Sequence, residues 1–246
     1  MSIDTAGGPS HASSPSQVTE ALSRTARTAG LLYLTLALTG GLGFLLVRPA
    51  LYVPGDASAT LAHLLEHEGL ARLGVALEMA TVIAQSLAAL WFYRLFRSVD
   101  DFAAGAIAVF GRFNAIAVFA SAALLGTALQ ATQAPIAPGG SDVQLAYLAS
   151  ANFWQVGNLF FGLWLIPMGW CTIHAAWRMP RLLGWILIVG GVGYVLNAFL
   201  GYLAPGNELL SGLLVLPATI GEFWMIGYLI IRGIGRPASS SASAAY

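Results

Sequence analysis

Six long apolar runs dominate the chain, and the charged residues fall almost entirely between them. The runs cover residues 29–47, 73–95, 102–129, 152–176, 182–203 and 211–231. Each is close to the roughly 20 apolar residues that a helix needs to cross a hydrocarbon core about 30 Å thick. The two-residue alternation of barrel strands is absent, and helices close their own backbone hydrogen bonds in lipid. The pattern therefore predicts an all-α, polytopic membrane protein with a bundle of six transmembrane helices.

The composition agrees with a protein that has the lipid bilayer as its main partner. Charged residues make up 9% of the chain, against about 25% in ordinary globular proteins, and hydrophobic residues make up 57%. The formal net charge is zero, and we expect no nucleic-acid partner.

The arginines predict the orientation of the bundle, because the chain contains no lysine. One set of connections and ends carries eight arginines, namely Arg24, Arg27, Arg94, Arg97, Arg178, Arg181, Arg232 and Arg236. The opposite side carries Arg48 and Arg72. Positive residues favour the cytoplasmic side, so both termini should be cytoplasmic.

Flanking segments set the domain boundaries. Residues 1–22 and 236–246 are rich in small and polar residues and should be disordered tails around a domain of residues 23–235. Between the first two runs, Asp56 and Gly69 bracket residues 57–68, which should form a short outer helix at the membrane interface. The single cysteine, Cys171, allows no internal disulfide.

Three charged residues inside the runs are candidates for a functional centre. Arg112 lies near the middle of the third run, where a charge costs about 2.5–3.5 kcal/mol on insertion scales. We therefore expect it to pair with Glu222 of the sixth run, with Glu78 of the second run close by. Two carboxylates facing one guanidinium favour protonation of one of them, and we assign Glu78 as the proton carrier. The alternative is an ion pair that only fixes helix register.

Polar side chains on other runs extend this centre. Gln85 shares a helix face with Glu78, and we add Asn114, Asn158 and Asn197 from the third, fourth and fifth runs. Taken singly, such residues also serve as interhelical hydrogen-bonding groups. Their recurrence on several helices favours one polar interior that could hold a ligand or a proton.

A segment of the outer connection matches the H-x-x-E-H pattern of inverted zincins. His63 and His67 could hold zinc and Glu66 could act as the base. A third protein ligand is not convincingly placed, and a solvated helix face explains the same residues, so we predict no metal site. Nucleotide-binding glycine motifs and cysteine ligand clusters are also absent, and we predict no cofactor.

Several short motifs resemble those of a known family. They are Gly30–Leu34, Val53–Ala57, Glu68–Gly74, Arg112 in the third run, and Gly221-Glu222 ahead of Ile231–Gly233. Together they resemble the bacterial multi-spanning membrane proteins of domain-of-unknown-function family 4386, over about residues 25–235. Gly111 stands where this family often has phenylalanine before the arginine. The resemblance implies the fold and a multi-pass location in the plasma (inner) membrane of a bacterium, and it implies no established activity.

These observations leave three classes of function open. The first is a protein that binds or transports a small solute or proton at a buried Arg/Glu centre. The second is a non-catalytic scaffold or sensor subunit, which packs against another membrane protein or a second copy of itself. The third and weaker alternative is a metalloenzyme on the outer face that uses the H-x-x-E-H segment.

Overall fold

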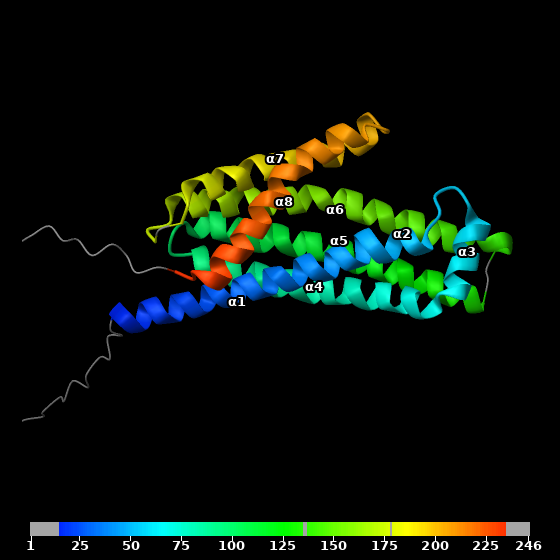
Figure 1. Cartoon of the computed structure of the whole chain (residues 1–246), viewed down its shortest axis with the longest axis horizontal. Coiled ribbons are helices and arrows are strands. Elements are labelled where there is room, and N and C mark those ends of the chain that lie inside the picture. Colours follow the sequence, from blue (N-terminus) through cyan, green and yellow to red (C-terminus); the bar gives the residue numbers. More distant parts are fainter. Residues whose placement is uncertain (1–14, 135–136, 178, 235–246) are drawn as a thin grey trace, which may run out of the picture.

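The computed structural model describes residues 15–134, 137–177 and 179–234. It is a bundle of helices, of which six are long and apolar enough to cross a membrane (Figure 1). The described residues contain no strand. The fold is thus the all-α, six-span membrane bundle that the apolar runs predict.

The first span is one continuous helix with three parts: α1 (Pro15–Gly41), the π-helical segment η1 (Leu42–Val47) and α2 (Arg48–Leu51). The short helix α3 (Ala57–Glu66) follows, and a single 3-10 turn (Pro138–Gly140) precedes the fourth span. The other five spans are α4 (Glu68–Phe96), α5 (Asp101–Gln133), α6 (Ser141–His174), α7 (Arg181–Leu203) and α8 (Glu208–Ile231).

Two boundaries differ from the sequence-based predictions. The first helix begins at Pro15, so residues 15–22 are helical and their assignment to a disordered tail was wrong. Residues 1–14 and 236–246, the rest of the two predicted tails, lie outside the described residues. The short helix at 57–68 is confirmed as α3, but α4 begins at Glu68, so Gly69 lies inside a helix and does not act as a stop.

Aspartates cap two of the helices. Asp56 accepts a hydrogen bond from the backbone N–H of Ala59 at 2.9 Å and begins α3, as predicted. Asp100 begins α5 in the same way, because it accepts from the backbone N–H of Ala103 and from Trp170 Nε1. These hydrogen bonds to the charged form lower the pKa of the Asp100 carboxyl below its ordinary value.

Each span packs against the next one along the chain, and α8 returns to contact α1. The described chain begins and ends at the same end of the bundle, which we call the terminal end (Figure 1). The opposite end, where α3 lies, is the α3 end. The hairpin of α7 and α8 is shorter than α5 and α6 and stops before the α3 end (Figure 1).

Glycines let the two helices of this hairpin, α7 and α8, pack closely against each other. A Cβ at Gly193 would overlap the carbonyl oxygen of Leu214, and one at Gly190 would overlap the backbone of Ala218. Pro217 lies inside α8 between these two contacts, where its ring disfavours a regular helix. Because Gly190 and Gly193 have no side chains, α7 leaves room for α8 at the point where α8 changes direction (Figure 1).

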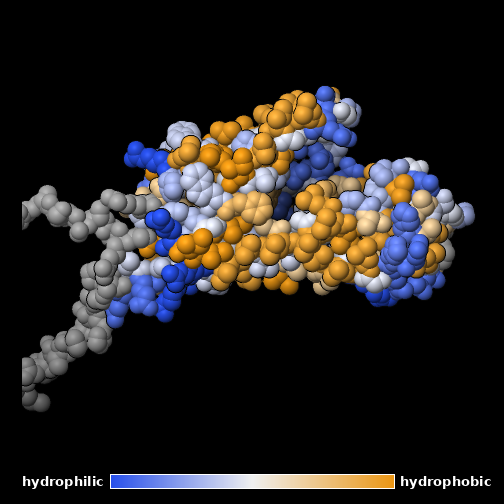
Figure 2. Space-filling view, in the orientation of Figure 1, coloured by the Kyte–Doolittle hydropathy of each residue, from blue (hydrophilic) through white to orange (hydrophobic). Residues whose placement is uncertain are grey.

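Buried apolar side chains form two clusters, and a polar layer separates them. The cluster toward the terminal end includes Tyr33, Phe92 and Trp164, and the cluster toward the α3 end includes Leu51 and Tyr147. Between them along the chain lie the buried polar residues of α4, α5 and α6, namely Glu78, Thr81, Asn114, Ser121 and Ser150. On the surface, the flank of the bundle is broadly apolar and the hydrophilic residues gather at its two ends (Figure 2), as expected for helices that cross a membrane.

Candidate functional site

One half of the polar layer is a buried ion pair between the first two spans. Arg48 Nη2 lies 3.0 Å from Glu78 Oε1, and the two side chains are 8% and 3% exposed. The same Nη2 donates to Ser150 Oγ at 2.6 Å and lies 3.4 Å from Ser121 Oγ. Nη1 donates to the carbonyl oxygen of Tyr147 at 3.4 Å. Arg48 therefore ties together four spans, which the sequence-based prediction missed because it treated Arg48 as a flanking charge.

The π-helical segment explains why Arg48 points inward. The backbone N–H of Arg48 donates to the carbonyl of Gly43, five residues earlier, instead of the usual four. Pro49 follows directly, and its ring would crowd the carbonyl of Leu45 in a regular helix, so a wider turn relieves this contact. One extra residue in a turn rotates all later residues by about 100° around the axis. This rotation brings the Arg48 side chain onto the interior face of the first span.

The other half of the polar layer is a cavity of about 260 Å³. Its walls come from α1 with η1, α4, α5, α6, α7 and α8, and they carry both polar and aromatic groups. The polar lining residues are Tyr33, Thr81, Asn114, Asn158, Tyr194 and Glu222, and the others are Leu36, Ala37, Gly40, Gly41, Leu45, Val118, Trp154, Phe161, Phe223 and Ile226.

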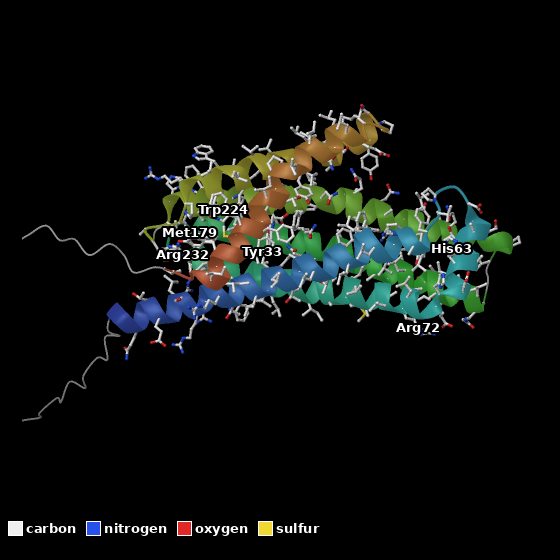
Figure 3. The ribbon with its side chains drawn as sticks, in the orientation of Figure 1. Tyr33, His63, Arg72, Met179, Trp224 and Arg232 are labelled. Carbon is white, nitrogen blue, oxygen red and sulfur yellow. The ribbon has the colours of Figure 1, made fainter. Side chains whose placement is uncertain are left out.

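Glu222 is held in this cavity by a tyrosine of the first span. Tyr33 donates its hydroxyl hydrogen to Glu222 Oε1 at 2.6 Å, where α8 crosses α1 (Figure 3). The Tyr33 ring is fixed in turn by edge-on contacts with Phe92 and Trp164, at centroid distances of 5.5 and 5.4 Å. Glu222 forms no ion pair with any residue that the structure describes. A carboxylate held rigidly but without a cation is able to receive a proton or a positively charged ligand.

Trp154 connects the ion pair to the cavity. Its indole N–H donates to Glu78 Oε1 at 3.0 Å, while its ring lines the cavity and lies 3.7 Å from the position that a Cβ on Gly40 would take. The Phe44 ring of η1 packs against it at a centroid distance of 4.9 Å. A movement of the cavity wall at Trp154 therefore changes a hydrogen bond of the buried carboxylate.

The predicted pair of Arg112 with Glu222 is wrong. Arg112 is exposed on α5 and forms no ion pair among the described residues. The interior face of α5 is set by Gly111, Asn114 and Ser121, and Arg112 lies about 100° around the helix from Gly111. The two carboxylates predicted to face Arg112 have other partners: Glu78 binds Arg48 and Glu222 binds Tyr33. The polar centre therefore does not contain Arg112.

The remaining predicted site residues fall into two groups. Asn114 and Asn158 line the cavity, and the Asn114 amide also donates to the Gly157 carbonyl at 3.0 Å. Gln85 and Asn197 are buried outside the lining. Both amide atoms of Gln85, and Oδ1 of Asn197, lack a hydrogen-bond partner among the described residues.

The H-x-x-E-H segment remains apart from this centre. His63 and Glu66 lie on α3, and His67 is the residue at which that helix ends. Figure 3 places His63 at the α3 end of the bundle. Within the described residues, no three histidine, cysteine or acidic side chains come together as a metal-binding group.

Fold and site together define a multi-pass, all-α membrane protein with a polar cavity between its spans. The chain belongs to the family described as Domain of unknown function (DUF4386), whose sequence model matches residues 28–233. No match was found among curated proteins or among solved structures.

Proposed function

We propose that the protein binds a small solute or a proton in the Glu222 cavity and that it does so as a membrane carrier or receptor. The supporting observation is a carboxylate without a cationic partner among the described residues, placed in a cavity between the spans by Tyr33. An intramembrane acid of this kind is costly to maintain, and such residues commonly mark substrate or proton pathways.

Gly41 offers a direct test because it lines the cavity and a Cβ added there meets no heavy atom within 4 Å. Gly41→Leu should fill part of the cavity without displacing the backbone. Gly212→Leu is the matched control, since Gly212 is exposed on α8 with the same free space. Native mass spectrometry of the purified full chain should find a small molecule with the unmodified protein and the control, and lose it with Gly41→Leu. Equal occupancy in all three, or none in the unmodified protein, contradicts solute binding.

A proton is distinguished from a solute by the carboxyl group itself. If Glu222 carries a proton, the infrared band of a protonated carboxyl should change with pH in the unmodified protein and be missing in Glu222→Gln. Glu208→Gln, which alters an exposed glutamate of the same helix, should leave that band unchanged.

A second candidate function, the scaffold or partner subunit, is favoured by Arg112. Its exposed guanidinium projects from a face that also carries Phe113 and Ile116, which are 48% and 60% exposed. A partner helix with an acidic residue would neutralise this charge within the membrane. Arg112→Leu should then abolish cross-linking to the partner within the membrane, while the cavity variants Gly41→Leu and Glu222→Gln retain it. Unchanged cross-linking of Arg112→Leu would rule out this candidate function.

We also propose a plasma-membrane location in a bacterium, with both termini cytoplasmic. Arg94, Arg97, Arg181 and Arg232 lie at helix boundaries of the terminal end, and Arg24 and Arg27 lie in the half of α1 nearest to it. Arg72 lies toward the α3 end (Figure 3). Arg178 and Arg236 lie outside the described residues.

A further inference from the structure

The charge of the Glu222 cavity points to the class of its ligand. Among the described residues that line it, Glu222 is the only carboxylate, and no arginine, lysine or histidine is present. The one buried guanidinium among the described residues, that of Arg48, is already matched by Glu78. An anionic ligand would therefore meet a carboxylate with no compensating cation, whereas a cation would neutralise it.

Aromatic rings make the same cavity suitable for an organic cation. Tyr33, Trp154, Phe161, Tyr194 and Phe223 contribute to the lining. Ring faces attract ammonium groups within about 6 Å, most strongly when water is excluded. Calcium sites usually combine several carboxylates with carbonyl oxygens, whereas this lining offers one carboxylate and several rings, so it fits an ammonium better than a hard metal ion.

The mouth of the cavity is apolar. Leu45 of η1 and Phe223 of α8 both line it and are 68% and 59% exposed, so both lie where the cavity meets the surface and form its rim. Figure 2 shows a recess with hydrophilic residues inside it and hydrophobic surface on both sides. Since these spans cross the membrane, an apolar rim between them contacts acyl chains, and it favours ligands that carry an apolar part.

We propose that the cavity takes an amphipathic organic cation, with its ammonium group at Glu222 and its apolar part at the Leu45–Phe223 rim. This inference rests on the proposed solute-binding function and specifies its ligand class. The volume is sufficient, because an apolar cavity of about 150 Å³ already accommodates benzene and this one measures about 260 Å³.

Three matched probes test the charge requirement: phenylbutylammonium, its neutral analogue phenylbutanol and its anionic analogue phenylbutanoate. Binding is measured by calorimetry on the full chain in nanodiscs, with protein-free nanodiscs to subtract partition into lipid. The ammonium should bind about 10- to 100-fold more tightly than the alcohol, as expected for a charge-assisted contact. Glu222→Gln should remove this preference, and Glu208→Gln should keep it.

Two rim variants test where the apolar part lies. Leu45→Ala and Phe223→Ala should weaken phenylbutylammonium and leave the binding of methylammonium, which has no apolar tail, unchanged. Equal loss for both cations would refute the rim position.

The outcomes separate this inference from the function on which it rests. If all three probes bind equally and Gly41→Leu abolishes all of them, the cavity binds solutes but the cation preference is wrong. Tightest binding of phenylbutanoate also overturns the preference. If none of the probes binds above the lipid background, the ligand class is wrong, and the proposed function is then judged by the native mass spectrum of the Gly41 variant.

Discussion

The buried Arg48–Glu78 pair should be far more strongly coupled than an exposed pair in the same protein. Arg48→Met leaves the Glu78 carboxylate with the Trp154 indole as its only hydrogen-bond donor among the described residues, and Glu78→Met leaves the guanidinium with neutral oxygens. Removing one partner of a buried pair costs about 3–5 kcal/mol, while replacing both by apolar residues of similar volume is often nearly neutral. The two single costs should therefore greatly exceed the cost of the double variant, with a coupling energy of about 3 kcal/mol or more.

The chain provides its own control for this double-mutant cycle. Glu68 and Arg72 form an i,i+4 pair on α4 whose side chains are 43% and 68% exposed. Such a pair is worth about 0.3–0.5 kcal/mol because water screens it. Both cycles are measured as free energies of unfolding, from mixed-micelle titrations with increasing SDS followed by circular dichroism. A buried-pair coupling no larger than that of the exposed pair would refute the argument that Arg48 and Glu78 depend on each other.

Three further results should follow from the same structure. Gly193→Ala should lower the free energy of unfolding by at least 1–3 kcal/mol, about the cost of overpacking, whereas Gly212→Ala should be neutral or stabilising by up to about 1 kcal/mol; micelle titrations compare the two. Folding lowers the pKa of the Asp100 carboxyl. The stability that Asp100 contributes is therefore complete above its pKa in the unfolded chain and is lost as the pH falls through its pKa in the folded protein. Asp100→Asn should thus show a smaller drop in thermal midpoint than the unmodified protein between about pH 5 and pH 2. In a Cys171→Ala background, a cysteine added at either terminus should react with membrane-impermeant maleimide only after the cells are opened, and labelling of intact cells would reverse the proposed orientation.

The six spans could be predicted from the sequence because burial in lipid requires a long apolar run, and such a run is visible without knowing any contact. The α3 cap was visible for a similar reason: Asp56 is adjacent in sequence to the backbone N–H that it binds. The start of the first helix was missed because residues 15–22 are polar, and the pattern of apolar residues does not show how far a helix continues beyond the membrane.

The partners in the polar layer could not be predicted, because depth alone does not fix the direction of a side chain. Glu222 and Glu78 were correctly placed among the interior polar residues. Their partners depend on helix rotation, which for the first span is altered by the π turn before Arg48. The available signal was Pro49, which makes a regular helix at that point unfavourable.

The two halves of the polar layer, the Arg48–Glu78 pair and the Glu222 cavity, have different roles. Arg48 and Glu78 neutralise each other, and their contacts with Ser150 and Tyr147 join the long spans, so this half stabilises one arrangement of the bundle. Glu222 lies on α8, a shorter span that contacts α1 and α7 and is bent near Pro217. A ligand that neutralises Glu222 while pressing on the Trp154 ring acts on both halves at once, since that indole donates to Glu78. Occupancy of the cavity is thereby linked to the one buried ion pair in the described part of the bundle, through a single side chain.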